Sequence, residues 1–273
     1  MINNSKEKIE KSVIKNSNSI IYISNNFIDS VHKFSMSEQR ILWYFLRFYK
    51  FNKLSTVSLD MVIKHNEYAI LFNMSTQQAA GEIASACLSL TKNMLYIPRP
   101  EWENNVIDCL EEKILTRDEL DKLLSFQASN IVDTCKFGIR RNESEIMFTS
   151  GFLKLILPLK NDIFTQYRLL QAKSIPNALH VALYEEFRRW VKAGFYKITP
   201  IRLINKLQLP HTYELYSQMR RGFIEPAIKS INNKTDLNIK LKEQRINPEN
   251  PHSKVINLIF SIEVKNIFKN VID

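Results

Sequence analysis

The 273-residue sequence contains few glycines, few cysteines and no long hydrophobic run. Its five glycines disfavour a turn-rich all-β fold, and none lies in a G-x-x-x-x-G-K-[ST] phosphate loop, so ATP hydrolysis is not expected. The three cysteines form no C-x-x-C pair, which argues against a disulfide framework or a zinc ribbon and fits a reducing cytoplasm. Because no apolar run approaches about 18 residues, we expect neither a membrane span nor a signal peptide.

Side chains that could hold a metal or carry out catalysis are also scarce. The five histidines are far apart in the sequence, and no two form a His-x-His pair that could bind a metal. Residues 101–121 contain eight acidic and two basic side chains, a cluster that could hold a divalent cation for nuclease chemistry. A solvated helical insertion explains these carboxylates more simply. We therefore expect no catalytic residue, no metal and no cofactor.

Positive charge is abundant, and its excess is concentrated in the second half of the chain. The formal net charge is +10, and residues 188–245 hold 13 Lys and Arg against 4 Asp and Glu. A folded segment this basic predicts a polyanionic partner. An acidic membrane surface is disfavoured, because no helix in the sequence combines a Lys/Arg face with a wide apolar face. Nucleic acid is the favoured partner.

The first half predicts a helix, a strand, a short helix, a turn, a longer helix and a hairpin. Ser35-x-x-Glu38 and Ser75-x-x-Gln78 are capping boxes that begin the two longer helices. We expect helices at 35–51, 67–72 and from 75 onward, a strand at 55–59, and a wing from 93–98 and 135–148. The helix that begins at residue 75 should bury Ala79, Ala80, Ile83, Ala84, Cys87 and Leu88 and expose Gln78, Ser85, Ser89 and Lys92. This order is typical of a winged helix.

The second half repeats the pattern. The expected elements are a helix at 177–194 that ends at Gly194, a strand YKIT, a short helix capped by Thr199 and Pro200, a long helix at 209–232, and strands at 236–241 and 255–262 around a polar linker. The sequence therefore predicts an α+β, mainly helical protein with two tandem winged-helix domains.

The stretch LPHTYELYSQMRRGFIEPAIKSIN at 209–232 has an apolar face and a basic face. Its apolar residues Leu215, Met219 and Phe223 precede Pro226, where the missing N–H should kink the helix. The opposite side carries Tyr213, Ser217, Arg220 and Arg221. The third helix of a winged helix lies in the DNA major groove, so these side chains are candidates for contacts with guanine edges and phosphates. The residues that flank the hairpin tip, where a wing would meet the DNA backbone, are Lys242, Arg245 and Lys254.

These motifs resemble the iteron-binding replication initiators of theta-replicating bacterial plasmids. The similarity covers about residues 25–263 and is most specific in LPHTYELYSQMRRGFIEPAIKSINNKTDLNIKL and VINLIFSI, with FSMSEQRILWYFL and FTQYRLL similar to the family's first domain. The resemblance implies two winged-helix domains and binding to directly repeated double-stranded DNA at a plasmid origin. It also implies a dimer that represses its own gene, a monomeric initiator form, and host partners such as the chromosomal initiator and the replicative helicase. Arg220 and Arg221 match the arginines of the family's second recognition helix, and Tyr213 matches its N-terminal tyrosine.

The expected organisation is a flexible tail at 1–25, a first domain at 26–172 and a main DNA-binding domain at 173–273. Two features depart from the family pattern: RINPENPHSK replaces a short basic wing tip, and the acidic segment 101–121 is long. Glu82 also lies beside the exposed polar residues of its helix and would repel phosphate. These departures favour dimerisation as the role of the first domain, with Gln78, Ser85, Ser89 and Lys92 as candidates for auxiliary DNA contacts.

Two other functions fit parts of the pattern. A winged-helix transcription regulator would share these residues, but would bind a single inverted repeat instead of an array of direct repeats beside its gene. A rolling-circle nickase would use a tyrosine and a metal held by paired histidines, and the spacing of the histidines argues against that chemistry.

Overall fold

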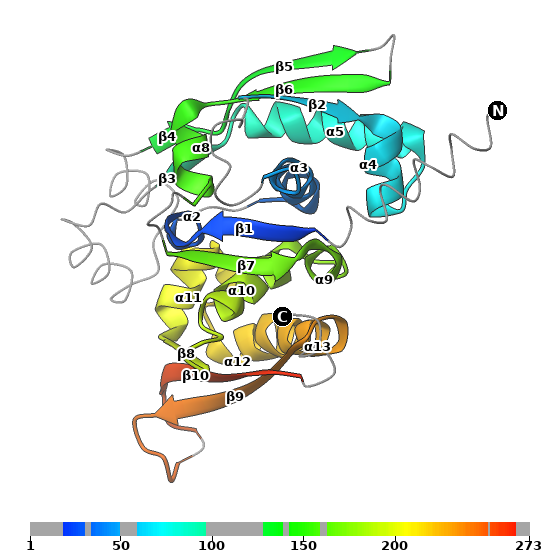
Figure 1. The fold of residues 1–273 in the computed structure, drawn as a ribbon. Helices are drawn as coiled ribbons and strands as arrows, with labels where there is room; N and C mark the ends of the chain where they lie inside the picture. The colour runs from blue at the N-terminus through cyan, green and yellow to red at the C-terminus, as the bar shows by residue number, and fades with distance from the viewer. Residues whose placement is uncertain are drawn as a thin grey trace. The chain divides into compact units, whose positions relative to one another are not determined.

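The computed structural model describes residues 19–30, 34–49, 59–96, 128–138, 142–158, 163–250 and 252–265 (Figure 1). These residues form two compact units. The first comprises the described parts of Met1–Phe27, Phe34–Leu95 and Ser129–Ala178, and the second comprises those of Ile28–Lys33, Tyr96–Ala128 and Leu179–Asp273. Each unit contains helices and a three-stranded antiparallel sheet.

Three helices of the first unit form a helix-turn-helix arrangement. They are α3 (Met36–Leu46), α4 (His65–Phe72) and α5 (Thr76–Leu90). Both predicted capping boxes are confirmed: the hydroxyls of Ser35 and Ser75 accept from the backbone N–H three residues on, and the Glu38 and Gln78 side chains accept from the cap N–H. Asn73 ends α4 in the left-handed conformation, with φ of 55°, and forms the predicted turn before α5.

The buried side of α5 differs from the predicted stripe. The buried residues are Ala79, Ile83, Ala86, Cys87 and Leu90. The prediction is wrong for Leu88, whose side chain is 51% exposed, because residue 88 lies half a turn around the helix from residue 79. Ala80 and Ala84 are partly exposed at the edge of the buried face. The buried face of α5 is therefore narrower than the predicted one.

The wing predicted for the first unit is present as a hairpin. The strands of this region are β2 (Asp60–Lys64), β3 (Met94–Tyr96), β4 (Ala128–Asn130), β5 (Val132–Gly138) and β6 (Glu143–Phe148). β5 and β6 pair as the hairpin, and β6 also pairs with β2. The segment expected to join this wing at 93–98 pairs elsewhere, since β3 forms a separate two-stranded sheet with β4. The strand expected at 55–59 lies outside the described residues except for Leu59, and β2 follows it directly.

The predicted flexible tail at 1–25 is wrong in its last residues. Ile20–Ser24 form β1, which pairs antiparallel with β7 (Phe164–Arg168). The alternation in IIYIS turns Ile21 and Ile23 into the core, and burying these side chains stabilises the strand. Three short helices, α2 (Asn25–Asp29), α8 (Ser150–Ile156) and α9 (Leu169–Ala172), follow β1, β6 and β7.

The second unit repeats the order of elements seen in the first. They are α10 (Ala178–Arg189), β8 (Phe195–Ile198), α11 (Pro200–Leu207), a 3₁₀ turn (His211–Tyr213), α12 (Tyr216–Met219), a π-helical turn (Arg220–Ile224), α13 (Glu225–Lys234), β9 (Leu237–Arg245) and β10 (Val255–Val264). β9 and β10 form a long hairpin, to which β8 adds beside β10 (Figure 1). Helix, strand, helix, turn, helix and hairpin is winged-helix topology, so the predicted fold is confirmed in both units.

One of the two helix caps predicted for this unit is confirmed. Thr199 caps α11 as predicted, with its hydroxyl accepting from the Arg202 N–H at 3.2 Å. The helix predicted to end at Gly194 ends earlier, at Arg189. Gly194 instead adopts φ of 76° directly before β8, a conformation that favours glycine.

The core of the second unit is aromatic. The ring centroids of Phe187 and Phe260 are 5.0 Å apart, and Tyr196 stacks on Phe260 at 6.2 Å. A buried ion pair joins α10 to the segment before β9, with Arg188 Nη1 donating to Asp236 Oδ2 at 3.0 Å. This core fixes the position of the hairpin, which carries part of the candidate site.

Candidate nucleic-acid interface

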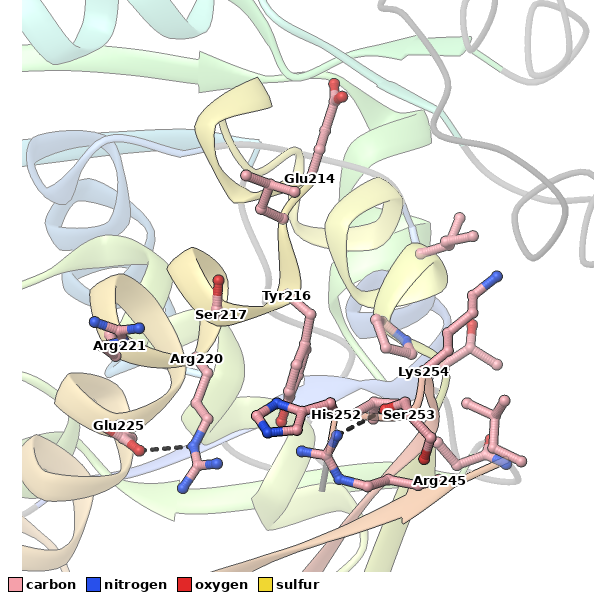
Figure 2. A pocket seen from close by; sticks show the side chains of 17 residues that line it. Glu214, Tyr216, Ser217, Arg220, Arg221, Glu225, Arg245, His252, Ser253 and Lys254 are labelled. Atoms are coloured by element: carbon pink, nitrogen blue, oxygen red, sulfur yellow. Dashed lines mark hydrogen bonds and ion pairs between the residues drawn. The ribbon is translucent and has the colours of Figure 1, made fainter. Parts of the chain in front are cut away.

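A groove of about 1400 Å³ lies in the second unit beside the helical stretch 216–234, which we call the recognition helix (Figure 2). The helix contributes Ser217, Arg220 and Arg221 to the lining. The β9–β10 hairpin, which we call the wing, contributes Arg245 and Lys254, and the start of α11 adds further residues. The fold therefore brings together five of the seven candidates that the sequence analysis takes from this unit.

Pro226 is the second residue of α13, which follows α12 and a π-helical turn without a break in the helix, and the kink at this proline stays a prediction. The chain is helical from Tyr216 to Lys234, and the turn directly before the proline is π-helical. Proline has no N–H to donate to the carbonyl four residues earlier, which belongs to Gly222. The Tyr213 hydroxyl donates to that carbonyl at 3.3 Å. The wider π turn and this hydrogen bond explain how the helix tolerates the proline.

Tyr213 already has a partner inside the protein. Its ring centroid is 6.1 Å from that of Phe223, and a Cβ added at Gly222 would lie 2.8 Å from its Cε1 atom. A DNA contact by Tyr213 stays a prediction. The prediction for Leu215 is wrong, since it precedes α12 and is 64% exposed, whereas Met219 and Phe223 are buried as expected. The helical periodicity begins only with α12 and does not extend back to this leucine.

Ser217, Arg220 and Arg221 are all exposed on the recognition helix. Figure 2 shows the Arg220 side chain directed toward Glu225 and the Arg221 guanidinium apart from it on the same helix. Within the described part of the chain, Arg221 makes no hydrogen bond or ion pair, so its guanidinium keeps all of its N–H donors for a ligand. Arg221 is therefore a free cation at the groove.

Arg220, in contrast, is held by two carboxylates. Its Nε donates to Glu225 Oε1 at 2.8 Å, and its Nη1 donates to Glu243 Oε1 at 2.8 Å (Figure 2 draws the first of these). Glu243 lies on β9 and also accepts hydrogen bonds from the Tyr216 hydroxyl, at 2.5 Å, and from the Arg245 guanidinium. This one carboxylate joins the recognition helix to the wing.

The electrostatics of this cluster keep Glu243 ionised. Burial acts to raise its pKa, but hydrogen bonds from Tyr216 and Arg245 and the positive charges of Arg220 and Arg245 outweigh burial and lower the pKa below its ordinary value. Burial and the hydrogen bond to Glu243 raise the pKa of the Tyr216 hydroxyl, so it stays a donor. The cluster consists of Arg220, Arg245, Glu225 and Glu243. Its two positive and two negative charges cancel.

The first strand of the wing ends later than predicted, because Lys242–Arg245 continue β9 and are not part of the linker. Lys242 and Lys254 are exposed, and neither ammonium group contacts another side chain in the described ranges. Arg245 donates from Nη1 to the Ser253 carbonyl at 2.7 Å, and the Ser253 hydroxyl donates to the Asn247 carbonyl at 2.6 Å. The two lysines are thus available to a ligand, while Arg245 shapes the tip.

The corresponding helix of the first unit, α5, exposes the predicted residues Gln78, Ser85 and Ser89, and the fourth, Lys92, is exposed in the turn just after the helix. Glu82 is not the free negative charge that the sequence analysis expects. Its Oε2 accepts from Arg40 Nη1 at 2.8 Å, and its Oε1 accepts from the Tyr68 hydroxyl at 2.7 Å. This pairing removes most of the repulsion that Glu82 would exert on a phosphate.

Tyr216, Glu225 and Glu243 belong to the site but are not predicted from the sequence. The signal for Glu243 is the alternation along β9, where it shares one face of the strand with Ile239 and Leu241, and Ile239 is buried. That spacing places the glutamate on the inward face. No comparable signal identifies Glu225, because an acidic residue in the first turn of a helix is common.

A metal site does not emerge from the described residues. No group of three or more His, Cys, Asp or Glu side chains among them could hold a metal ion. The acidic segment 101–121, Cys109 and His32 lie outside the described ranges. Of the helices that the structure describes, none is both long enough and apolar enough to cross a membrane.

Comparisons with known proteins agree with this architecture. The family model described as initiator replication protein, WH1, matches residues 20–188, and that described as initiator Rep protein, WH2, matches residues 201–262. A relative from Escherichia coli, described only as an uncharacterized 27.6 kDa protein, is 25% identical over 229 residues, which cover 78% of this chain and 85% of the relative. The crystal structure of the Pi initiator protein in complex with iteron DNA has a similar fold, with a TM-score of 0.67 and 15% identity over 92% of this chain and 99% of that chain.

Proposed function

This chain belongs to the family of initiator replication proteins with two winged-helix domains, and we propose that it binds directly repeated double-stranded DNA at a plasmid origin to start theta replication. The observation that carries the proposal is the groove, where the recognition helix and the wing present Arg221 and Lys254 without partners among the described residues. The Pi initiator protein, which shares the fold, is bound to iteron DNA in its crystal structure.

In this proposal the recognition helix of the second unit enters the major groove. Ser217, Arg220 and Arg221 meet base edges or phosphates, and Lys242 and Lys254 bind the sugar–phosphate backbone from the wing. The two remaining candidates, Tyr213 and Arg245, support these contacts indirectly. Tyr213 donates to the Gly222 carbonyl in the π turn, and Arg245 donates to the Ser253 carbonyl at the wing tip.

The first domain has a smaller part in DNA binding. The exposed face of α5 offers small polar groups, and Lys92 just after the helix adds a cation, so this surface makes few phosphate contacts. We assign Gln78, Ser85, Ser89 and Lys92 an auxiliary role and the domain at 26–172 a dimer interface. The dimer represses the protein's own gene, and a monomeric form starts replication with host proteins such as the chromosomal initiator and the replicative helicase.

A selection experiment tests the proposal. The full chain enriches duplexes from a random-sequence library, and the enriched motif is compared with the DNA that flanks the gene. We expect a motif that recurs there as direct repeats, and a plasmid that carries those repeats should replicate when the protein is supplied in trans. A motif found only as one inverted repeat, without replication, would support a plain transcription regulator. A library without any enriched motif would refute specific DNA binding.

The same DNA separates the proposal from a rolling-circle mechanism. Supercoiled plasmid that carries the repeats should stay intact with the purified protein and Mg²⁺ or Mn²⁺. Nicking that disappears when one tyrosine is replaced by phenylalanine would assign the protein to the nickase class.

A further inference from the structure

The pairing of Arg220 distinguishes it from its neighbour Arg221 and from the two wing lysines, and Arg245 is the other paired arginine at the groove. Arg221, Lys242 and Lys254 have no ion-pair partner in the described ranges, whereas two carboxylates lie 2.8 Å from the Arg220 guanidinium. The Arg220 side chain is nevertheless 45% exposed, so a ligand in the groove can reach it. Exposed ion pairs contribute little stability, and holding a long side chain in one orientation costs entropy. Stability alone therefore does not account for the arrangement.

The hydrogen bonds leave Arg220 able to read a base. Nε–H is occupied by Glu225 and one Nη1–H by Glu243. The other Nη1–H and both N–H groups of Nη2 have no partner among the described residues. A bidentate contact with O6 and N7 of guanine needs two donors from one guanidinium. Arg220 keeps enough donors for that contact without releasing either carboxylate, and its orientation is set before DNA binds.

Phosphate is a poorer ligand for the same guanidinium. Glu225 and Glu243 bring two negative charges within hydrogen-bond distance of Arg220, and Glu225 is itself 50% exposed. A phosphate that approached Arg220 would meet these like charges. A guanine edge presents uncharged acceptors and avoids that repulsion. The cluster therefore favours a base edge over the DNA backbone.

We propose that Glu243 and Glu225 make Arg220 a specificity-determining residue: the two carboxylates orient its guanidinium for a guanine edge and cancel the charge that would otherwise bind any phosphate. Glu243 is a positioning residue that acts through Arg220, and Tyr216 and Arg245 hold Glu243 in place from the helix and from the wing. The inference rests on the proposed function, because it requires a protein that discriminates among duplexes.

Glu243→Gln in the full chain tests the inference. The probes are the duplex enriched by the wild-type protein and a scrambled duplex of the same base composition, with binding isotherms at several salt concentrations. The change releases Arg220 Nη1 for phosphate, so affinity for the scrambled duplex should rise about threefold to tenfold at low salt and the salt slope should steepen by about 0.9. The ratio of the two affinities should fall about tenfold, since the base contact loses its fixed orientation.

Glu249→Gln is the matched control. Glu249 is exposed in the wing tip, and its carboxylate contacts no other described residue. The control changes the net charge by the same amount, so it should raise both affinities equally and leave their ratio unchanged. In an Arg220→Ala background, Glu243→Gln should no longer alter the ratio, because Glu243 acts through that arginine.

Glu225→Gln gives a second test on the exposed side of the helix. It decides the question if a thermal melt shows that the Glu243→Gln variant is not folded. This variant should also lower the ratio of the affinity for the enriched duplex to the affinity for the scrambled duplex. A wild-type protein that discriminates, with both glutamine variants keeping the ratio of the control, would overturn this inference and leave the proposed function intact. A wild-type protein with equal affinity for both duplexes would overturn the proposed function, and this inference with it.

Discussion

Replacing Gly222 by alanine should destabilise the recognition helix, although the same change in an ordinary helix stabilises it. Alanine gains up to about 1 kcal/mol over glycine in a helix interior. Here the new Cβ would lie 2.8 Å from Cε1 and 3.4 Å from the hydroxyl oxygen of Tyr213. Moving the ring away would weaken its contact with Phe223 and break the hydrogen bond from its hydroxyl to the Gly222 carbonyl.

The expected net effect is a loss of about 1 kcal/mol in the free energy of unfolding. Displacing the ring breaks a hydrogen bond of about 0.5–1.5 kcal/mol and weakens an aromatic contact of similar size, which together exceed the helix-propensity gain. In a Tyr213→Ala background the obstruction is absent, and Gly222→Ala should stabilise by about 0.5–1 kcal/mol. The two changes should therefore be coupled by about 1.5–2 kcal/mol, as is typical of side chains in contact.

Urea unfolding of the full chain measures this double-mutant cycle. Hydrogen exchange of the peptide that covers residues 219–234 assigns the change to the recognition helix. Equal stabilisation by Gly222→Ala in both backgrounds would show that Tyr213 does not lie against the helix. That result would also leave the Tyr213 hydroxyl free for DNA.

Three further predictions concern the groove and the cores of the two units. Arg221→Ala should weaken binding evenly across duplexes and reduce the salt slope by about 0.9, and a loss confined to one base position would instead make Arg221 a base reader. Asp236→Asn should lower the free energy of unfolding by about 3 kcal/mol in urea, because it leaves Arg188 without its buried partner. Burial lowers the pKa of His65 below its ordinary value of 6.5, so the unfolded state takes up the proton first and stability should fall as the pH drops through about 6.5. Thermal melts should show a smaller fall for His65→Gln, and an equal fall would assign the effect to another group.

Local signals in the sequence predict much of the fold. The caps at Ser35, Ser75 and Thr199 each involve a side chain and a backbone N–H three residues on, so their spacing in the sequence is sufficient to identify them. The strand Ile20–Ser24 escapes the same reasoning because its pairing partner, Phe164–Arg168, lies at the other end of the first unit's sequence. Its polar flanking residues dominate the local composition and suggest a tail.

The cations of the interface are predictable, but their pairing is not. Arg220 and Arg221 are adjacent and chemically identical in the sequence, yet the fold pairs the first with two carboxylates and gives the second no ion-pair partner among the residues that the structure describes. Glu243 is 23 residues from Arg220, so no local spacing indicates their contact. The part played by Tyr213 depends on the π turn before Pro226, a backbone departure that side-chain periodicity does not reveal.

The affinity of the Arg220→Ala/Arg221→Ala double variant for the enriched duplex tests most directly whether the recognition helix of the second unit reads DNA. We predict a loss of about 100-fold at moderate salt, from one base contact of about 1–3 kcal/mol and one phosphate contact. Both side chains are exposed, so a parallel urea melt should show a change of no more than about 0.5–1 kcal/mol in the free energy of unfolding. A double variant that binds the enriched duplex as tightly as the wild-type protein would contradict the account.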